Sequence, residues 1–75
     1  MAALTNYNYT TDYAEFAIGD SSEISKLPTT HRGGTDELAA IDRPIKAGIA
    51  YTTDGNFDIY TLDAGTDVWN KNQEA

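Results

Sequence analysis

The clearest pattern of apolar and polar positions in the chain lies in residues 47–62, which read AGIAYTTDGNFDIYTL. Ile49 and Tyr51 share one phase of a first alternating run, and Phe57 and Ile59 share one phase of a second run. Alternation with a period of two is typical of β-strands. Asp54-Gly55-Asn56 lies between the runs and supplies the positive-φ residues that a tight hairpin requires. The pattern therefore predicts a β-hairpin.

The second run of this hairpin is apolar in both phases, because Tyr60 and Leu62 alternate with Ile59 and Thr61. Such a strand is typical of a sheet position that is covered on both faces, or of a strand at a subunit interface. After a further turn, Val68-Trp69 predicts a short last strand.

The N-terminal residues also alternate, since Tyr7 and Tyr9 are interleaved with Asn and Thr. This pattern predicts an extended arm over residues 1–12, which would add to a sheet edge of its own chain or of a neighbour. The alternative is a frayed tail with exposed tyrosines. The following segment, Tyr13–Ile18, alternates again and predicts a strand.

The middle of the chain is less regular. Ile24 and Leu27 are spaced like anchors of one helical turn, which must end before Pro28 because proline disfavours helical backbone in the preceding residue. Polar and glycine residues in 29–34 predict a loop. Thr35–Arg43 fits an irregular segment or one helical turn, and a strand that ends before Pro44 is the alternative.

These elements predict a mostly-β fold: a small antiparallel meander or sandwich built on the hairpin 47–62. The expected organisation is an arm over residues 1–12, a single small β-rich domain over 13–71 and a polar tail over 72–75. Seventy-five residues with no cysteine allow only a thin core without disulfides. Small domains of this kind often gain stability by oligomerising or by docking on a partner.

The net charge is −7, which disfavours direct binding to nucleic acid because phosphate neutralisation needs Lys and Arg. Four of the five basic residues lie within residues 26–46. This segment is either an ordinary solvated surface or a contact surface for an acidic partner. No apolar run is long enough to span a membrane, and the N-terminus lacks the features of a signal peptide, so we expect synthesis in the cytoplasm.

The residues that usually carry catalysis are scarce. His31 is the one histidine, and a pairing with a serine is the weakest of the possible readings. Asp54-x-Asn56-x-Asp58 imitates the start of a calcium loop, but Ile59 and Gly65 stand where that loop needs Gly and Glu. We therefore expect no catalytic residue, no cofactor and no metal, and we interpret these aspartates as turn residues.

The chain resembles small virion proteins of tailed phages in an outline that covers roughly residues 24–71. The outline consists of a Leu-Pro-Thr segment, a Gly-rich stretch, a strand with Ala-Tyr, an acidic-Gly turn, an aromatic strand and a final Trp. The matching residues are Leu27-Pro28-Thr29, Gly33-Gly34, Pro44-Ile45-Lys46-Ala47-Gly48, Ala50-Tyr51, Asp54-Gly55, Ile59-Tyr60-Thr61-Leu62-Asp63 and Trp69. Gly48 departs from the outline, which usually has a small Ser or Thr there.

The resemblance implies a non-enzymatic structural component of a phage particle, found in the virion, that binds the major capsid protein or another virion protein. A decoration, cement or head-fibre attachment role and a homo-oligomer, with a trimer favoured, fit this class. The alternative is an acidic inhibitor of the DNA-mimic type that blocks a nucleic-acid-binding host protein. The candidate partner-binding residues are Tyr7, Tyr9, Tyr13, Lys26, Arg32, Arg43, Lys46, Tyr60 and Trp69.

Overall fold

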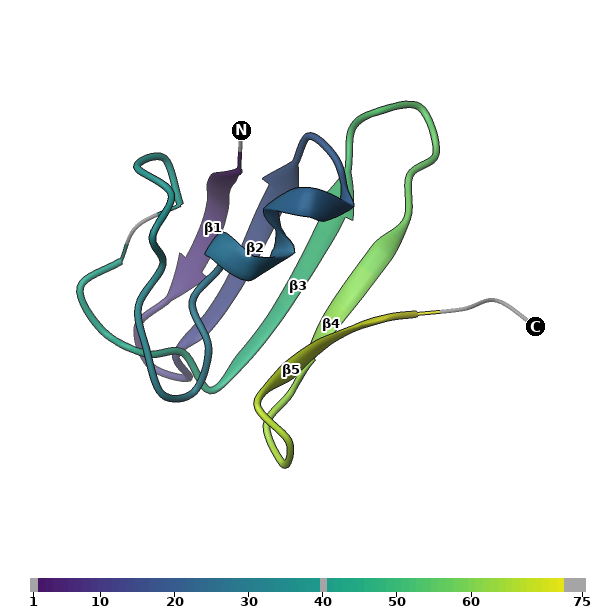
Figure 1. Ribbon diagram of the computed structural model, residues 1–75. Coiled ribbons are helices and arrows are strands. Elements are labelled where there is room, and N and C mark those ends of the chain that lie inside the picture. The colour runs from purple at the N-terminus through teal and green to yellow at the C-terminus, as the bar shows by residue number, and fades with distance from the viewer. Residues whose placement is uncertain (1, 40, 73–75) are drawn as a thin grey trace.

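Figure 1 shows a computed structural model of the chain, in which residues 2–39 and 41–72 are described. The mostly-β prediction is confirmed, because the strands of these residues form one five-stranded sheet with a single short 3-10 helix. The elements are β1 (Ala3–Asn8), β2 (Tyr13–Ile18), η1 (Ser21–Lys26), β3 (Ala47–Thr52), β4 (Ile59–Asp63) and β5 (Val68–Lys71). Within the described ranges, no helix is long and apolar enough to cross a membrane.

The strands lie in the sheet in their sequence order, as a meander requires, but one pairing differs from the prediction. β2 and β3 run parallel, with Tyr13 opposite Ala47 and Ile18 opposite Thr52, whereas the other three pairs are antiparallel. Parallel neighbours need a long connection that returns to the starting end of the sheet. Residues 19–46, which we call the crossover, provide this connection, so the sheet is mixed.

The predicted N-terminal arm is not confirmed, because β1 is an edge strand of the chain's own sheet (Figure 1). β1 pairs with β2 from Ala3 opposite Ala17 to Asn8 opposite Tyr13. Ala2 is fully buried. The alternation correctly predicted extended backbone, but the strand's partner could only be identified in the folded chain. At the other end, residues 73–75 of the predicted tail lie outside the described residues.

The helical turn predicted around Ile24 and Leu27 is confirmed as η1. Asp20 caps η1 by accepting a hydrogen bond from the Ser22 amide at 2.9 Å. Glu23 completes a capping box through the Gly19 and Asp20 amides at 2.8 and 3.3 Å. Leu27 returns to extended backbone before Pro28, as expected for a residue that precedes proline.

Among its described residues, the rest of the crossover is irregular, as predicted for residues 35–43, with one turn at residues 37–39. Asp36, which is buried, shapes this turn: its carboxylate accepts from the Leu38 amide at 3.0 Å and from the Ala2 amide at 3.2 Å. The Leu4 amide donates to the Leu38 carbonyl at 3.1 Å. The crossover therefore lies against the outer edge of β1 and occupies part of it.

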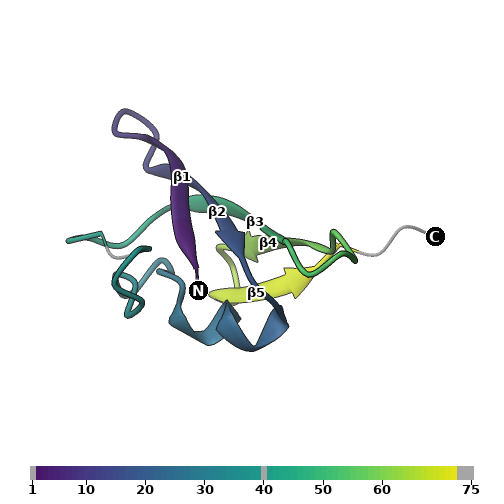
Figure 2. The same cartoon turned by 90° about the horizontal axis from the view of Figure 1, so that it is seen from above.

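The core fills the space between one face of the sheet and the crossover, and the edge-on view of Figure 2 shows η1 on that side. Every second residue of β2 is buried, including Phe16 and Ile18. Leu27 and Ile45 of the crossover close over them and are almost completely buried. The period-two pattern of β2 thus directs one phase into the core.

Trp69 of β5 completes the core, where its ring packs edge-on against Phe16 with centroids 6.0 Å apart. The indole Nε1 donates to the Pro28 carbonyl at 3.0 Å. Gly48 faces the indole, and a Cβ there would lie 2.6 Å from Cη2 of Trp69. The position needs a residue without a side chain because the tryptophan ring occupies the space.

The predicted hairpin 47–62 is confirmed: β3 and β4 are antiparallel, with Tyr51 opposite Ile59. Its connection is wider than the predicted tight turn, because β4 begins only at Ile59. The positive φ angles fall at Gly55 (102°) and Phe57 (51°), and Asn56 is not among them. The Asn56 amide donates to the Asp54 carboxylate at 3.1 Å, as an Asx turn requires.

Candidate functional site

Three of the candidate partner-binding residues, two tyrosines and one arginine, lie together beside the hairpin of β1 and β2, which we call the first hairpin. The rings of Tyr7 and Tyr9 pack edge-on with centroids 4.6 Å apart, and the guanidinium carbon of Arg43 lies 5.7 and 5.3 Å from the two centroids. Arg43 Nε donates to the Tyr7 hydroxyl at 2.9 Å and Nη2 donates to Asp12 at 2.8 Å. Lys46 is 3.8 Å from the same aspartate.

This arrangement raises the pKa of Arg43, first through the Tyr7 hydrogen bond and then through the charge of Asp12. Burial acts in the opposite direction. The guanidinium is therefore a permanent charge that is matched by a carboxylate and stacked against aromatic faces. The cluster thus combines a permanent cation with two aromatic rings, and the Tyr7 hydroxyl also donates to Asp12 at 3.1 Å.

The remaining basic candidates do not join this cluster. Lys26 is exposed at the end of η1, and Arg32 is exposed in the crossover, where it donates to the Ser25 carbonyl. The sequence placed both in a basic middle segment, but the fold distributes this segment over separate parts of the crossover. Shared position in the sequence was therefore a poor guide to shared position on the surface.

Tyr60 and Trp69 contribute mainly to the chain's own packing. Tyr60 is half-buried and packs against the core cluster, and Trp69 is 7% exposed. Trp69 was named as a candidate partner-binding residue, and its ring lies in the core of its own chain.

The face of the sheet opposite the crossover carries no covering element among the described residues, and Figure 2 shows this side bare. The strand register places Ala17, Tyr51 and Ile59 in one row across β2, β3 and β4. We call this surface the open face and define it by residues Tyr13, Glu15, Ala17, Ile49, Tyr51, Phe57, Ile59 and Thr61.

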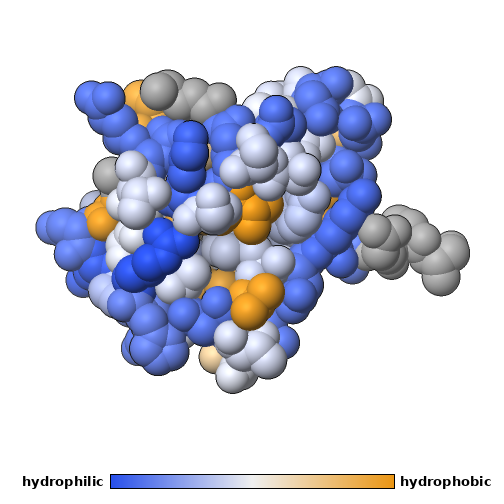
Figure 3. Space-filling view, viewed as in Figure 1, coloured by the Kyte–Doolittle hydropathy of each residue, from blue (hydrophilic) through white to orange (hydrophobic). Residues whose placement is uncertain are grey.

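The open face has an apolar and aromatic centre. The rings of Tyr51 and Phe57 lie 5.8 Å apart, and Phe57 is 64% exposed. Ile49, Tyr51 and Ile59 are half-buried by their neighbours alone. By contrast, the crossover side in Figure 3 is largely hydrophilic with small separate apolar patches.

Of the open-face residues, only Tyr13 was among the predicted partner-binding residues. The Tyr13 hydroxyl donates to Glu15 at 3.2 Å. Burial raises the pKa of Tyr13, and the hydrogen bond to Glu15 and its negative charge raise it further. For the other open-face residues, the only signal in the sequence was that both phases of residues 57–62 are apolar. This pattern indicated a second apolar face, but it did not identify Ile49, Tyr51 and Phe57 as part of it.

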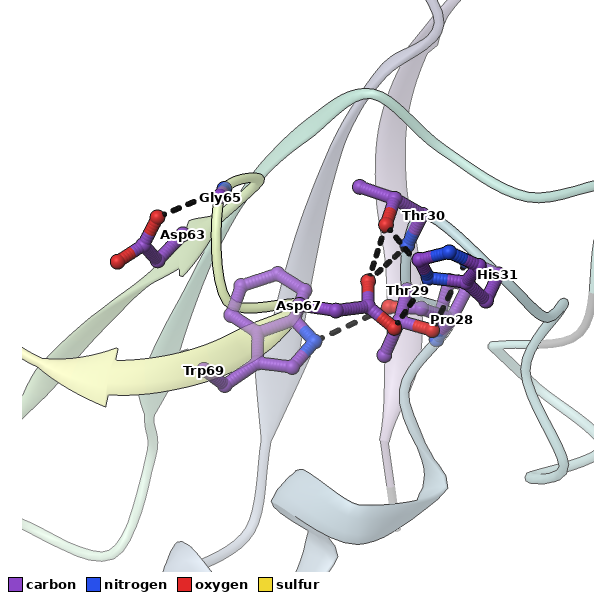
Figure 4. Close-up of polar contacts among 8 residues, drawn as sticks. All are labelled: Pro28, Thr29, Thr30, His31, Asp63, Gly65, Asp67 and Trp69. Carbon is purple, nitrogen blue, oxygen red and sulfur yellow. Dashed lines mark hydrogen bonds and ion pairs between the residues drawn. The ribbon is translucent and has the colours of Figure 1, made fainter.

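A polar junction joins the crossover to the β4–β5 turn (Figure 4). Asp67, at φ 58°, accepts from the Thr30 amide at 2.6 Å, from the Thr30 hydroxyl and from His31 Nδ1, which lies at 2.9 Å. The Thr30 hydroxyl hydrogen bond is the main cause that lowers the pKa of Asp67 to about 2, with smaller contributions from His31 and from the Thr30 amide.

The junction does not have the geometry of a catalytic triad. The same His31 nitrogen, Nδ1, faces both Asp67 and the Thr30 hydroxyl, which lies 3.1 Å away. A triad needs the carboxylate on one ring nitrogen and the nucleophile on the other. The contacts of His31 are with Thr30 and Asp67 instead of a serine, and the junction holds the crossover against the sheet beside Trp69.

The other aspartates of the C-terminal turns act on their own backbone. Asp63 accepts from the Gly65 amide at 2.9 Å, in the same manner as Asp54 at the hairpin connection. In the part of the chain that the structure describes, no three His, Asp or Glu side chains are grouped to hold a metal ion. Comparison of the chain with protein-family models, with curated proteins and with solved structures finds no match.

Proposed function

We propose that this chain is a non-enzymatic structural component of a phage particle, which binds the capsid or another virion protein as a decoration, cement or attachment module. The observation that carries the proposal is the open face, whose apolar centre is covered by none of the elements in the described ranges 2–39 and 41–72. The resemblance of residues 24–71 to small virion proteins supports the particle as its location.

The energetics of the open face favour a protein partner. Burial of a large apolar side chain contributes on the order of 1.5–3 kcal/mol, so Tyr51, Phe57 and Ile59 together could anchor a stable contact. Among the residues that define the open face, Glu15 is the one charged residue, and none is basic. The partner surface is then apolar at its centre and basic at its rim. A homo-oligomer, with a trimer favoured, would present several such faces at once.

The acidic-inhibitor alternative has weaker support. A phosphate mimic needs free carboxylates in a continuous stripe, whereas Asp20, Asp54 and Asp63 accept hydrogen bonds from neighbouring backbone amides. These three carboxylates are therefore oriented by their own turns, which weakens the support for this alternative.

Removal of residues 1–12 would not test the proposal, because it removes β1 and the buried Ala2 and would disturb the fold. Point substitutions on the open face are suitable instead. The purified chain is mixed with particles of the phage that carries its coding sequence, after these have been stripped of accessory proteins, and particle-bound chain is measured by co-sedimentation. We expect the wild type to sediment with particles, and Tyr51→Lys and Ile59→Lys to remain in the supernatant.

Ser25→Lys is the matched control, because Ser25 is exposed on η1 and the substitution adds the same charge on the other side of the sheet. Circular dichroism shows whether each variant keeps its fold, and sedimentation equilibrium gives the mass relative to the 8.2 kDa monomer. A wild-type chain that does not bind particles, folded open-face variants that still bind them, or a coding sequence outside any phage or prophage would each contradict the proposal.

A further inference from the structure

The connection between β3 and β4 contains the one Asp-Gly sequence of the chain, Asp54-Gly55. Both residues are exposed and lie outside the strands. Gly55 has a φ of 102°, and a Cβ built on it would have no atom of the described residues within 4 Å. The peptide bond between Asp54 and Gly55 is therefore accessible, and the surrounding chain leaves room for it to change conformation.

The Asp54 carboxyl group is folded back over this peptide bond. Its Oδ1 accepts from the Asn56 amide at 3.1 Å, and this hydrogen bond closes a ring of atoms between the side chain and the main chain. The Gly55 nitrogen is a member of that ring, which keeps it close to the carboxyl carbon. An electrophilic carbon and a nucleophilic nitrogen are thus held together, and no side chain on Gly55 separates them.

We propose that Asp54-Gly55 is a site of spontaneous modification, at which aspartate converts to isoaspartate. The Gly55 nitrogen attacks Cγ of the protonated Asp54 carboxyl group and forms a C–N bond. The carboxyl hydroxyl leaves with the nitrogen's proton as water, and a five-membered succinimide ring remains. Water then opens this ring at one of its two carbonyl carbons. Opening at Cγ restores aspartate, whereas opening at the main-chain carbonyl carbon leaves the chain linked through the side chain as isoaspartate.

The turn between β4 and β5 provides an internal comparison. Asp63 is exposed and accepts from the Gly65 amide at 2.9 Å, so it forms the same type of turn. The residue that follows is Ala64, whose Cβ hinders an attack by its own nitrogen. The main chain of Asp63 is also held in place, because its carbonyl accepts from the Asp67 amide at 2.7 Å. We therefore expect Asp54, and not Asp63, to react.

The modification would alter the open face, because the connection leads directly to Phe57. Isoaspartate brings Cβ of residue 54 into the main chain and lengthens the connection by one carbon atom. The side-chain carbonyl becomes the peptide carbonyl, so the present turn is lost. Phe57 has a φ of 51°, which a residue of this size keeps only where its surroundings enforce it. We expect the longer connection to release the Phe57 ring from its contact with Tyr51 at 5.8 Å.

The first test measures the reaction in the full chain, which is incubated for several weeks at mildly acidic pH, both folded and unfolded in urea. Isoaspartate at each position is quantified by electron-transfer fragmentation of peptides and by enzymatic methylation. In the folded chain, residue 54 should contain at least about tenfold more isoaspartate than residue 63, because Gly55 has no Cβ. The yield at residue 54 should stay within about threefold of the yield in urea, since an exposed loop restricts the peptide bond little.

The second test measures the effect on the open face. The isoaspartyl form is separated by chromatography, and nuclear Overhauser contacts between the rings of Tyr51 and Phe57 should be lost from it. Asp54→Glu is the matched control, because it keeps the charge and Gly55 but would have to close a six-membered ring. After the same incubation this variant should contain no isomerised linkage at residue 54, and it should keep the ring contacts.

Three results would count against the inference. Comparable isoaspartate at residues 54 and 63 would show that Gly55 does not select the site. A deficit larger than threefold against the chain in urea would show that the fold protects Asp54, and either result overturns the proposed modification. Unchanged contacts between Tyr51 and Phe57 in the isoaspartyl form would refute the effect on the open face. None of these measurements needs a particle, so the inference stands or falls separately from the proposed function.

Discussion

The contact between Gly48 and Trp69 allows a sharp test of how the core is built. Replacement of Gly48 by Ala adds one methyl group, at 2.6 Å from Trp69 Cη2, 3.2 Å from Cζ2 and 2.9 Å from Ile45 Cδ1. Carbon atoms do not approach this closely, so the indole, Ile45 or the β3 backbone must move. The indole cannot move freely, because Nε1 donates to the Pro28 carbonyl and the ring packs against Phe16.

The expected loss follows from two opposing effects. Overpacking of a filled core costs typically 1–3 kcal/mol, and about 1 kcal/mol more is lost if the Nε1 hydrogen bond breaks. Alanine in a strand is favoured over glycine by about 0.5–1 kcal/mol, which offsets part of this cost. We therefore expect Gly48→Ala to lower the free energy of unfolding by about 1–2 kcal/mol, or the melting temperature by roughly 5–15 °C in a domain of this size.

Urea unfolding is the suitable assay, because the fluorescence of Trp69, the one tryptophan of the chain, reports directly on the affected site. Gly65→Ala is the matched control, since a Cβ at Gly65 would meet only a carboxylate oxygen of Asp63 at 3.3 Å. The control should stay within about 0.5 kcal/mol of the wild type. Trp69→Phe removes the atoms that clash, so the cost of Gly48→Ala should fall by about 1 kcal/mol in that background when both are followed by circular dichroism.

Two results would refute this reasoning. The indole does not lie over Gly48 if Gly48→Ala is as stable as the wild type and keeps the same tryptophan emission maximum. If Gly48→Ala costs the same in the Trp69→Phe background as in the wild type, the loss comes from the Ile45 contact or the β3 backbone and not from the tryptophan contact.

Two further predictions concern the crossover. The folded-state pKa of Asp67 is about 2, below its ordinary 3.8, so its hydrogen bonds stabilise the fold above pH 3.8, and this stabilisation is lost as the pH falls toward 2. The urea midpoint should therefore decline over that interval in the wild type, and less in Asp67→Asn, while a parallel decline in both proteins would contradict the role of Asp67. Asp36→Ala should cost about 1–3 kcal/mol, because it leaves the Ala2 and Leu38 amides without their acceptor. Amide exchange at Leu4 should accelerate while that of Tyr51 stays protected, and unchanged exchange at Leu4 would show that β1 is held without the crossover.

The strands themselves were predictable because their side chains obey the period of two. Tyr13–Ile18 has the predicted bounds, and the hairpin 47–62 lies where its pattern placed it. The turn at η1 was predicted from the spacing of Ile24 and Leu27, and its end was predicted from Pro28. The parallel pairing of β2 and β3 was not predictable, because the crossover between them has no periodic pattern, and the direction of a returning strand depends on how that segment packs.

The role of β1 shows a different limit. Tyr7, Tyr9 and the polar residues between them indicate extended backbone, but an arm and an edge strand share this pattern. The residue that decides between them is Asp36, whose buried carboxylate holds the Ala2 amide from thirty-four positions away. No local feature of the sequence relates these two residues, and the same holds for Asp67 and Thr30.

The open face was predictable where it depends on the alternation of apolar and polar residues along the strands. The apolar character of both phases in residues 57–62 correctly indicated that the sheet has a second face with apolar side chains. The clustering of basic residues in 26–46 suggested one basic contact surface. The crossover instead places these residues on separate parts of the surface. Arg43 alone reaches the tyrosines, since Asp12 draws its guanidinium to the first hairpin.

The two faces of the sheet have unequal requirements, and this asymmetry explains the chain's composition. The covered face can be filled by few large side chains because Trp69 spans the space above Gly48, and the polar junction at Asp67 fixes the crossover beside it. Tyr51, Phe57 and Ile59 therefore do not contribute to this core. The chain has only fifteen Ile, Leu, Val, Met, Phe and Trp residues, so large apolar side chains are scarce. Placing them on the uncovered face costs solubility and gains nothing for a solitary chain. These side chains would stabilise the protein only if a partner in an assembly buried the open face. For this reason the proposed function rests on the open face and not on the acidic surface.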